Sequence, residues 1–209
     1  MKSALLSFFA AFAAASVALA DVDLGSAASR TPYDSYMAPV KQVLATLKPA
    51  NPSLDRVNTL MREGLSFPYS FTEPYVAASP EVTAATKKGD CKAKALWLAN
   101  EMGDQNVRFV VGKAHRGSKL SHAWLIWQHE GQWFILDPTN TSRAIPADRV
   151  SDNDYIPLYS WSKGGTYKHS ETASLASASK NGIARKTSKK FGHSSSPVAM
   201  GNPSAFFHR

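Results

Sequence analysis

Apolar residues recur three or four positions apart in two stretches near the start of the chain, which is the spacing of one face of an α-helix. Residues 39–47 form the first stretch and residues 52–63 the second. Asn51 followed by Pro52 is a helix-start signal, and Gly64 is a reasonable end for the second helix. Both stretches are short and amphipathic, so we expect two helices that pack against the rest of the fold.

A third helical stretch begins at Cys91, the only cysteine in the protein. Asp90 is a favourable N-cap and Gly103 a favourable C-terminal stop. The apolar face consists of Ala95, Leu98, Ala99 and Met102. Cys91 therefore falls in the first helical turn, where free backbone N–H groups and the positive end of the helix dipole favour a thiolate over a thiol.

Three strands are predicted after this helix, at residues 107–111, 121–128 and 132–136. The last two are apolar on both faces and are expected to be central. The two residues between them, Glu130 and Gly131, predict a two-residue hairpin turn that pairs the residues on either side of it.

This register decides whether His122 and Asp137 meet. If His129 pairs with Gln132, then Asp137 lies opposite Trp124. Residues two apart on a strand share a face, so His122 and Asp137 become diagonal neighbours at roughly 7 to 8 Å along the backbone. A register shifted by one residue would place them on opposite faces.

Cys91, His122 and Asp137 form the candidate catalytic set for acyl transfer through a thioester. The cysteine would attack a carbonyl carbon, the histidine would move the proton, and the aspartate would fix the imidazole tautomer. The alternative for a lone cysteine is a buried, inert side chain. An oxyanion would need a donor besides the Cys91 amide, and the sequence does not identify that second donor.

Three short motifs in this order resemble the core of the transglutaminase-like superfamily, including bacterial transglutaminase-like cysteine proteinases. They are Gly89-Asp90-Cys91, His122-Ala123-Trp124 and Trp133-Phe134-Ile135-Leu136-Asp137-Pro138-Thr139. The resemblance covers about residues 57–140. It implies that Cys91, His122 and Asp137 are the catalytic triad. Calcium-dependent periplasmic proteinases of this group have an acidic residue directly after the cysteine, whereas this chain has Lys92, so the resemblance does not carry calcium dependence over to this chain.

Residues 67–88 hold several aromatic residues and three prolines in a stretch predicted to be irregular. Long loops often build binding sites, so these aromatics either line a substrate groove or cover the edge of the core. Tyr69 is the candidate for a contact with substrate or oxyanion, and Trp124 a second candidate for substrate. His115 and His129 lack the spacing of metal ligands, so no metal and no cofactor are expected.

The two ends of the chain differ from its middle. Residues 1–20 read as a signal peptide, with Lys2 before an apolar run and an Ala-Leu-Ala cleavage site, which predicts a periplasmic or secreted protein. Residues 162–209 are rich in Ser and Lys with a net charge of +7, and are predicted to be disordered. Such a tail either binds an anionic envelope polymer or membrane surface or is merely solvated. No specific nucleic-acid recognition and no membrane span in the mature chain are expected.

The expected architecture is α+β: a transglutaminase-like, papain-like cysteine proteinase core over residues 21–161, with the Cys91 helix packed on a small antiparallel sheet. The expected function is that of an exported thiol enzyme acting on peptide or protein amides, by cleavage or by acyl transfer. The alternative is a non-catalytic cell-envelope binding protein that uses the same core as a scaffold for the basic tail.

Overall fold

A computed structural model of the chain describes residues 24–170. The predicted signal peptide and residues 171–209 of the predicted tail lie outside the described residues. Within the described part, no helix is both long and apolar enough to span a bilayer.

Residues 24–170 contain four α-helices and two short 3-10 helices, which connect the strands. The helices are η1 (Asp34–Tyr36), α1 (Ala38–Thr46), α2 (Leu54–Ser66), α3 (Pro80–Thr86), α4 (Cys91–Met102) and η2 (Ala147–Arg149). The three predicted helices are confirmed as α1, α2 and α4. For α4 the predicted caps are also confirmed, because Asp90 accepts a hydrogen bond from the Ala93 amide and Gly103 adopts a left-handed conformation.

The predicted start of α2 is wrong by two residues. Ser53 is the N-cap and accepts a hydrogen bond from the Arg56 amide, while Asn51 has a left-handed φ of 45° outside the helix. Gly64 does not end the helix, which continues for two more residues. A Cβ atom at Gly64 would lie 2.8 Å from Pro138 and 3.0 Å from the Trp97 ring, so this glycine serves close packing.

The segment predicted to be irregular contains α3. Ser79 caps it by accepting a hydrogen bond from the Val82 amide, and Pro80 occupies its first turn. Its seven residues are too few for a helical period of apolar residues to stand out in the sequence, which explains why the helix was not predicted.

The strands in the described part of the chain form one seven-stranded antiparallel sheet, larger than the small sheet expected. They are β1 (Ser26–Ala27), β2 (Val107–His115), β3 (His122–His129), β4 (Gln132–Leu136), β5 (Ile145–Pro146), β6 (Asp154–Ser162) and β7 (Gly165–Lys168). Their order is β1-β7-β6-β2-β3-β4-β5. The predicted boundary of the tail at Ser162 is therefore wrong, because β7 follows it and pairs with both β6 and β1.

The predicted register of the β3–β4 hairpin is confirmed. His129 pairs with Gln132, and the two turn residues Glu130 and Gly131 have φ values of 49° and 79°. Positive φ at both positions suits the right-handed twist of the flanking strands. The pairing of Leu125 with Leu136 carries the register to the end of β4, so His122 and Asp137 share a face.

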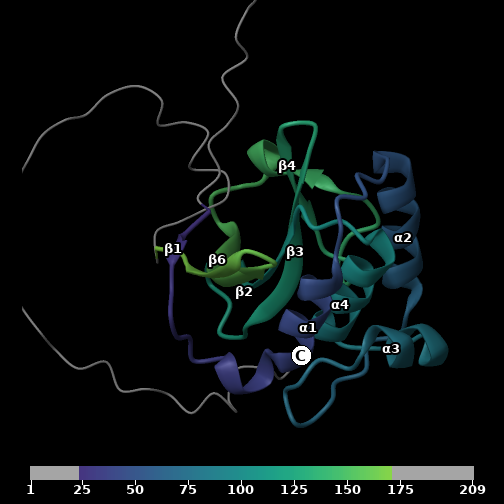
Figure 1. Ribbon diagram of the computed structural model, residues 1–209, viewed down its shortest axis with the longest axis horizontal. Helices are drawn as coiled ribbons and strands as arrows, with labels where there is room; N and C mark the ends of the chain where they lie inside the picture. The colour runs from purple at the N-terminus through teal and green to yellow at the C-terminus, as the bar shows by residue number, and fades with distance from the viewer. Residues whose placement is uncertain (1–23, 171–209) are drawn as a thin grey trace, which may run out of the picture.

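The four α-helices of the described residues gather beside one face of the sheet, with α4 among them (Figure 1). The main core lies between α4 and this face and includes Leu96, Trp97 and Leu125. A second, smaller core lies on the other side and includes Trp124, Ile126 and Tyr155. The α+β class is confirmed. Ten of the twelve residues of α4 are buried, and this packing fixes the position of the helix.

Candidate active site

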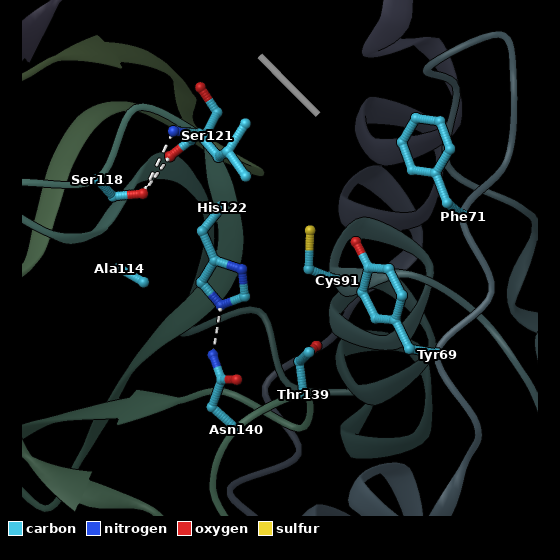
Figure 2. A pocket seen from close by; sticks show the side chains of 10 residues that line it. Tyr69, Phe71, Cys91, Ala114, Ser118, Ser121, His122, Thr139 and Asn140 are labelled. Carbon is cyan, nitrogen blue, oxygen red and sulfur yellow. Dashed lines mark hydrogen bonds between the residues drawn. The ribbon is translucent and has the colours of Figure 1, made fainter. Parts of the chain in front are cut away.

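Cys91 is the first residue of α4 and is 3% exposed. The N-cap Asp90 accepts a hydrogen bond of 3.1 Å from the Ala93 amide, which fixes the start of the helix. The sulfur therefore lies at the positive end of the helix dipole. It projects toward the ring of His122 from the opposite side of a pocket (Figure 2).

His122 opens β3 and is held between Cys91 and Asp137. Its Nε2 atom lies 2.8 Å from Asp137 Oδ2, and its other ring nitrogen faces the Cys91 sulfur (Figure 2). Burial opposes a charge on the ring, but hydrogen bonds with Asp137 and Cys91 outweigh it and raise the pKa of His122 to about 10. The imidazolium is thus the favoured form at neutral pH.

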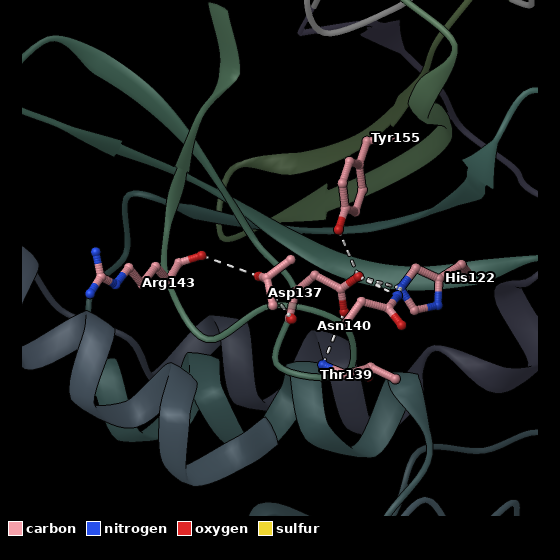
Figure 3. Close-up of polar contacts among 7 residues, drawn as sticks. His122, Asp137, Thr139, Asn140, Arg143 and Tyr155 are labelled. Atoms are coloured by element: carbon pink, nitrogen blue, oxygen red, sulfur yellow. Dashed lines mark hydrogen bonds and ion pairs between the residues drawn. The ribbon is translucent and has the colours of Figure 1, made fainter. Parts of the chain in front are cut away.

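Asp137 follows β4 directly and is completely buried. Besides His122, it accepts hydrogen bonds from the Thr139 amide at 3.0 Å, from Asn140 Nδ2 at 2.7 Å and from the Tyr155 hydroxyl at 3.0 Å (Figure 3). Burial would raise the pKa of this carboxyl, but the bonds from His122, Asn140 and Thr139 hold it below its ordinary value. Asp137 is therefore a carboxylate with its oxygens fully engaged.

Asn140 and Tyr155 are site residues that the sequence analysis missed. Asn140 lies three residues after Asp137, so its place in the turn was a usable signal. Tyr155 had none, because it comes from β6 on the far side of β2. It has a left-handed φ of 51°, unusual for a large side chain, and this conformation accompanies a hydroxyl directed at Asp137.

The pocket in front of Cys91 has a volume of about 760 Å³. Its lining residues are Tyr69, Phe71, Cys91, Ala114, Ser118, Leu120, Ser121, His122, Thr139 and Asn140. The segment before α3 forms one wall and the β2–β3 connection the other, with Cys91 between them (Figure 2). Among the described residues that line the pocket, only His122, Cys91 and Tyr69 are ionisable, so the lining offers no carboxylate, lysine or arginine to pair with a charged group of a substrate.

The structure brings Tyr69 to Cys91. Its hydroxyl lies beside the Cys91 side chain (Figure 2), where it interacts with the sulfur and with the backbone amide of Cys91. Burial is the main cause of the raised pKa of Tyr69, and electrostatic interactions with Cys91 and Asp90 add to it. The phenol therefore stays protonated and able to donate at neutral pH.

Trp124, the other candidate for contact with substrate, lies elsewhere. It is completely buried, is not a lining residue of the pocket, and packs edge-on against Tyr155 with ring centres 5.4 Å apart. The Trp124 ring also stacks on the His122 ring, with ring centres 6.0 Å apart. This position supports the orientation of His122 and offers no surface to a substrate.

The remaining predicted histidines lie outside the site. His115 contacts Asp154 and His129 contacts Asn51, both at exposed positions. Among residues 24–170, no three His, Cys, Asp or Glu side chains cluster in a way that could hold a metal ion.

No family model and no curated protein matches this chain. Solved structures do match. Legionella pneumophila LapG in its calcium-bound form has 18% identity over 64% of this chain and 76% of that one, with a TM-score of 0.45. The EGTA-treated form of LapG has 17% identity over 64% and 74%, also at 0.45. A Cytophaga hutchinsonii protein proposed to be a cysteine protease has 17% identity over 53% and 42%, at 0.34.

LapG is a transglutaminase-like cysteine protease, so the matched structures include the class that the motifs of this chain resemble. Identities below 25% and TM-scores below 0.5 leave the chemistry to the geometry of the site itself.

Proposed function

We propose that the protein is an exported thiol enzyme that cleaves or transfers the acyl groups of peptide or protein amides. One observation carries the proposal: a cysteine at a helix start faces a histidine whose far nitrogen is bonded to a buried, fully hydrogen-bonded carboxylate. This is the arrangement of a nucleophile, a base and an orienting acid. The resemblance of the sequence motifs around Cys91, His122 and Asp137 to transglutaminase-like cysteine proteinases points to peptide or protein amides as the substrate class.

In the first half-reaction, the Cys91 thiolate attacks the amide carbon and a C–S bond forms. The imidazolium of His122 then gives its proton to the leaving nitrogen as the C–N bond breaks, which releases an amine and leaves a thioester. Asp137 stabilises the imidazolium and keeps Nε2 protonated, so that the ring nitrogen facing the sulfur carries the transferable proton.

In the second half-reaction, water or an amine attacks the thioester. Neutral His122 takes a proton from the attacking group, and the C–S bond breaks to return the thiolate and the imidazolium. Hydrolysis gives a carboxylic acid and transfer gives a new amide. We favour hydrolysis slightly, because the domain is small and nothing in it marks an amine-acceptor site.

The Cys91 amide and the Tyr69 hydroxyl are our candidates for the two oxyanion donors. The two groups lie next to each other beside the sulfur, since the Tyr69 hydroxyl is placed at the Cys91 side chain and interacts with the Cys91 amide (Figure 2). An oxyanion formed there would accept from both groups. Tyr69→Phe is therefore expected to slow acylation while leaving the thiol exposed to small reagents.

A library of peptides from a digested proteome tests the proposal. Mass spectrometry would detect new termini from cleavage, and incorporation of a fluorescent primary amine would detect transfer. Both signals should disappear with Cys91→Ser and Asp137→Asn and persist in a chain ending at Ser170. Turnover by none of these proteins, with binding to envelope material that needs only residues 171–209, would instead favour the non-catalytic alternative, for which the basic tail is the supporting feature.

A further inference from the structure

A buried ion pair lies directly beside Cys91. The Lys92 ammonium contacts the Asp90 carboxylate, and the two side chains are 4% and 1% exposed. The same ammonium lies over the Phe71 ring, 5.1 Å from its centre. Removing two charges from water is costly, so a buried pair is retained at this position only if its geometry serves a purpose or is well compensated.

Asp90 links the catalytic helix to one wall of the pocket. While Oδ1 caps α4, Oδ2 accepts from the amide and hydroxyl of Thr72 at 3.4 and 3.2 Å. The backbone adds two further bonds, from the Gly89 amide to Pro68 and from the Ser70 amide to Gly89, each of 3.2 Å. Residues 68–72 are thus docked on the two residues that precede the nucleophile.

This docked segment supplies the side chains of the wall. Tyr69 and Phe71 line the pocket on the side opposite His122 (Figure 2). Lys92 is not a lining residue, and it reaches the wall through Phe71 and through the carboxylate that holds Thr72. Its charge compensates the carboxylate, which lets Asp90 serve the helix and the wall together.

We propose that Lys92 is a positioning residue whose ammonium acts as an internal cation, holding the Tyr69–Phe71 wall against the start of α4 and so setting the width of the cleft at Cys91. The inference rests on the proposed function, because cleft width matters for a nucleophilic Cys91. Loss of the ammonium leaves the Asp90 carboxylate buried without a counter-charge, and the wall loosens. The size of substrate that reaches the sulfur is then no longer restricted, while the Cys91–His122 pair is untouched.

Two thiol reagents of different size test this in the full chain. Iodoacetamide measures the reactivity of Cys91, and fluorescein-5-maleimide measures access for a bulky group. For Lys92→Met we expect the ratio of bulky to small reagent rates to rise about tenfold, with iodoacetamide rates within about twofold of wild type. Thr72→Val, which keeps the ion pair, should raise the ratio in the same direction. Lys88→Met, at an exposed lysine four residues earlier, should leave it unchanged.

Hydrogen exchange separates positioning from general destabilisation. In Lys92→Met the Ser70 and Thr72 amides should exchange faster while the amides of β3 keep their protection. A folded Lys92→Met protein with an unchanged reagent ratio and unchanged exchange at residues 68–72 would overturn the inference. If that variant does not fold, an unchanged ratio in Thr72→Val overturns it. Low wild-type reactivity toward iodoacetamide at mildly acid pH would count against the proposed function instead. The reagent ratio and the hydrogen exchange of residues 68–72 would still decide whether Lys92 positions the wall.

Discussion

The pair formed by His122 and Asp137 predicts that stability falls at alkaline pH. The folded protein raises the pKa of His122 from its ordinary value of 6.5 to about 10. Because the folded-state pKa is raised, the stabilisation is complete below about pH 6.5 and is lost as the pH rises through about 10. The same pair lowers the pKa of Asp137. The stabilisation that the pair gives to the folded protein is therefore also lost as the pH falls below the ordinary carboxyl range.

The size of the effect follows from the shift. Within this window each pH unit removes about 1.4 kcal/mol from the free energy of unfolding. If the whole rise in the His122 pKa contributes, the free energy of unfolding falls by about 3 kcal/mol between about pH 7 and 9.5. Cys91 supplies part of the shift, so in a Cys91→Ser background we expect about 2 to 3 kcal/mol.

Urea unfolding followed by tryptophan fluorescence measures this loss. Cys91→Ser would be compared with the same protein carrying His122→Gln as well, at several pH values across the window. The difference in unfolding free energy between the two should shrink steadily as the pH rises. A difference that stays constant with pH would show that His122 is not charged in the folded protein and would refute the reasoning.

Three further predictions concern the surroundings of the triad. Tyr155→Phe removes a hydrogen bond to the buried carboxylate and should lower the free energy of unfolding by about 1.5 to 3 kcal/mol in urea titrations; no loss would contradict the bond. Gly112→Ala places a Cβ atom against the backbone carbonyl of Ile156 in β6 and 2.7 Å from the Trp124 ring, so we expect a cost of about 1 to 3 kcal/mol and slower alkylation of the Cys91 thiol; a neutral effect would mean that β2 and β6 move apart to make room. EGTA should leave alkylation unchanged, because the Lys92 ammonium repels a divalent cation from its carboxylate partner; a slower rate that calcium restores would refute this.

The triad could be predicted because each of its members is fixed by local signals. Asp90 and Gly103 mark the ends of one helix, and a two-residue turn sets the register that brings His122 and Asp137 to the same face. Each of these signals involves only a few neighbouring residues. Because side chains alternate between the two faces of a strand, the register at the turn also determines which face His122 and Asp137 occupy.

The rest of the site depends on contacts between distant segments, which no local pattern encodes. Tyr155 reaches Asp137 only because β6 pairs with β2 across a bulge. The contact of Lys92 with Phe71 depends on how residues 68–72 fold back onto the helix start. Strand β7 was placed in the tail because Ser, Gly and Lys dominate residues 162–209 as a whole, although the pairing of this strand with β6 and β1 outweighs that composition.

The most direct test of the central claim is the rate of Cys91 alkylation as a function of pH, measured for wild type and for His122→Ala. The charged histidine facing the sulfur predicts a fast rate that persists well into the acid range in wild type and is lost there in the variant. A thiol that reacts slowly at mildly acid pH, or that behaves identically in both proteins, would show that Cys91 and His122 do not form a reactive pair and would contradict the account.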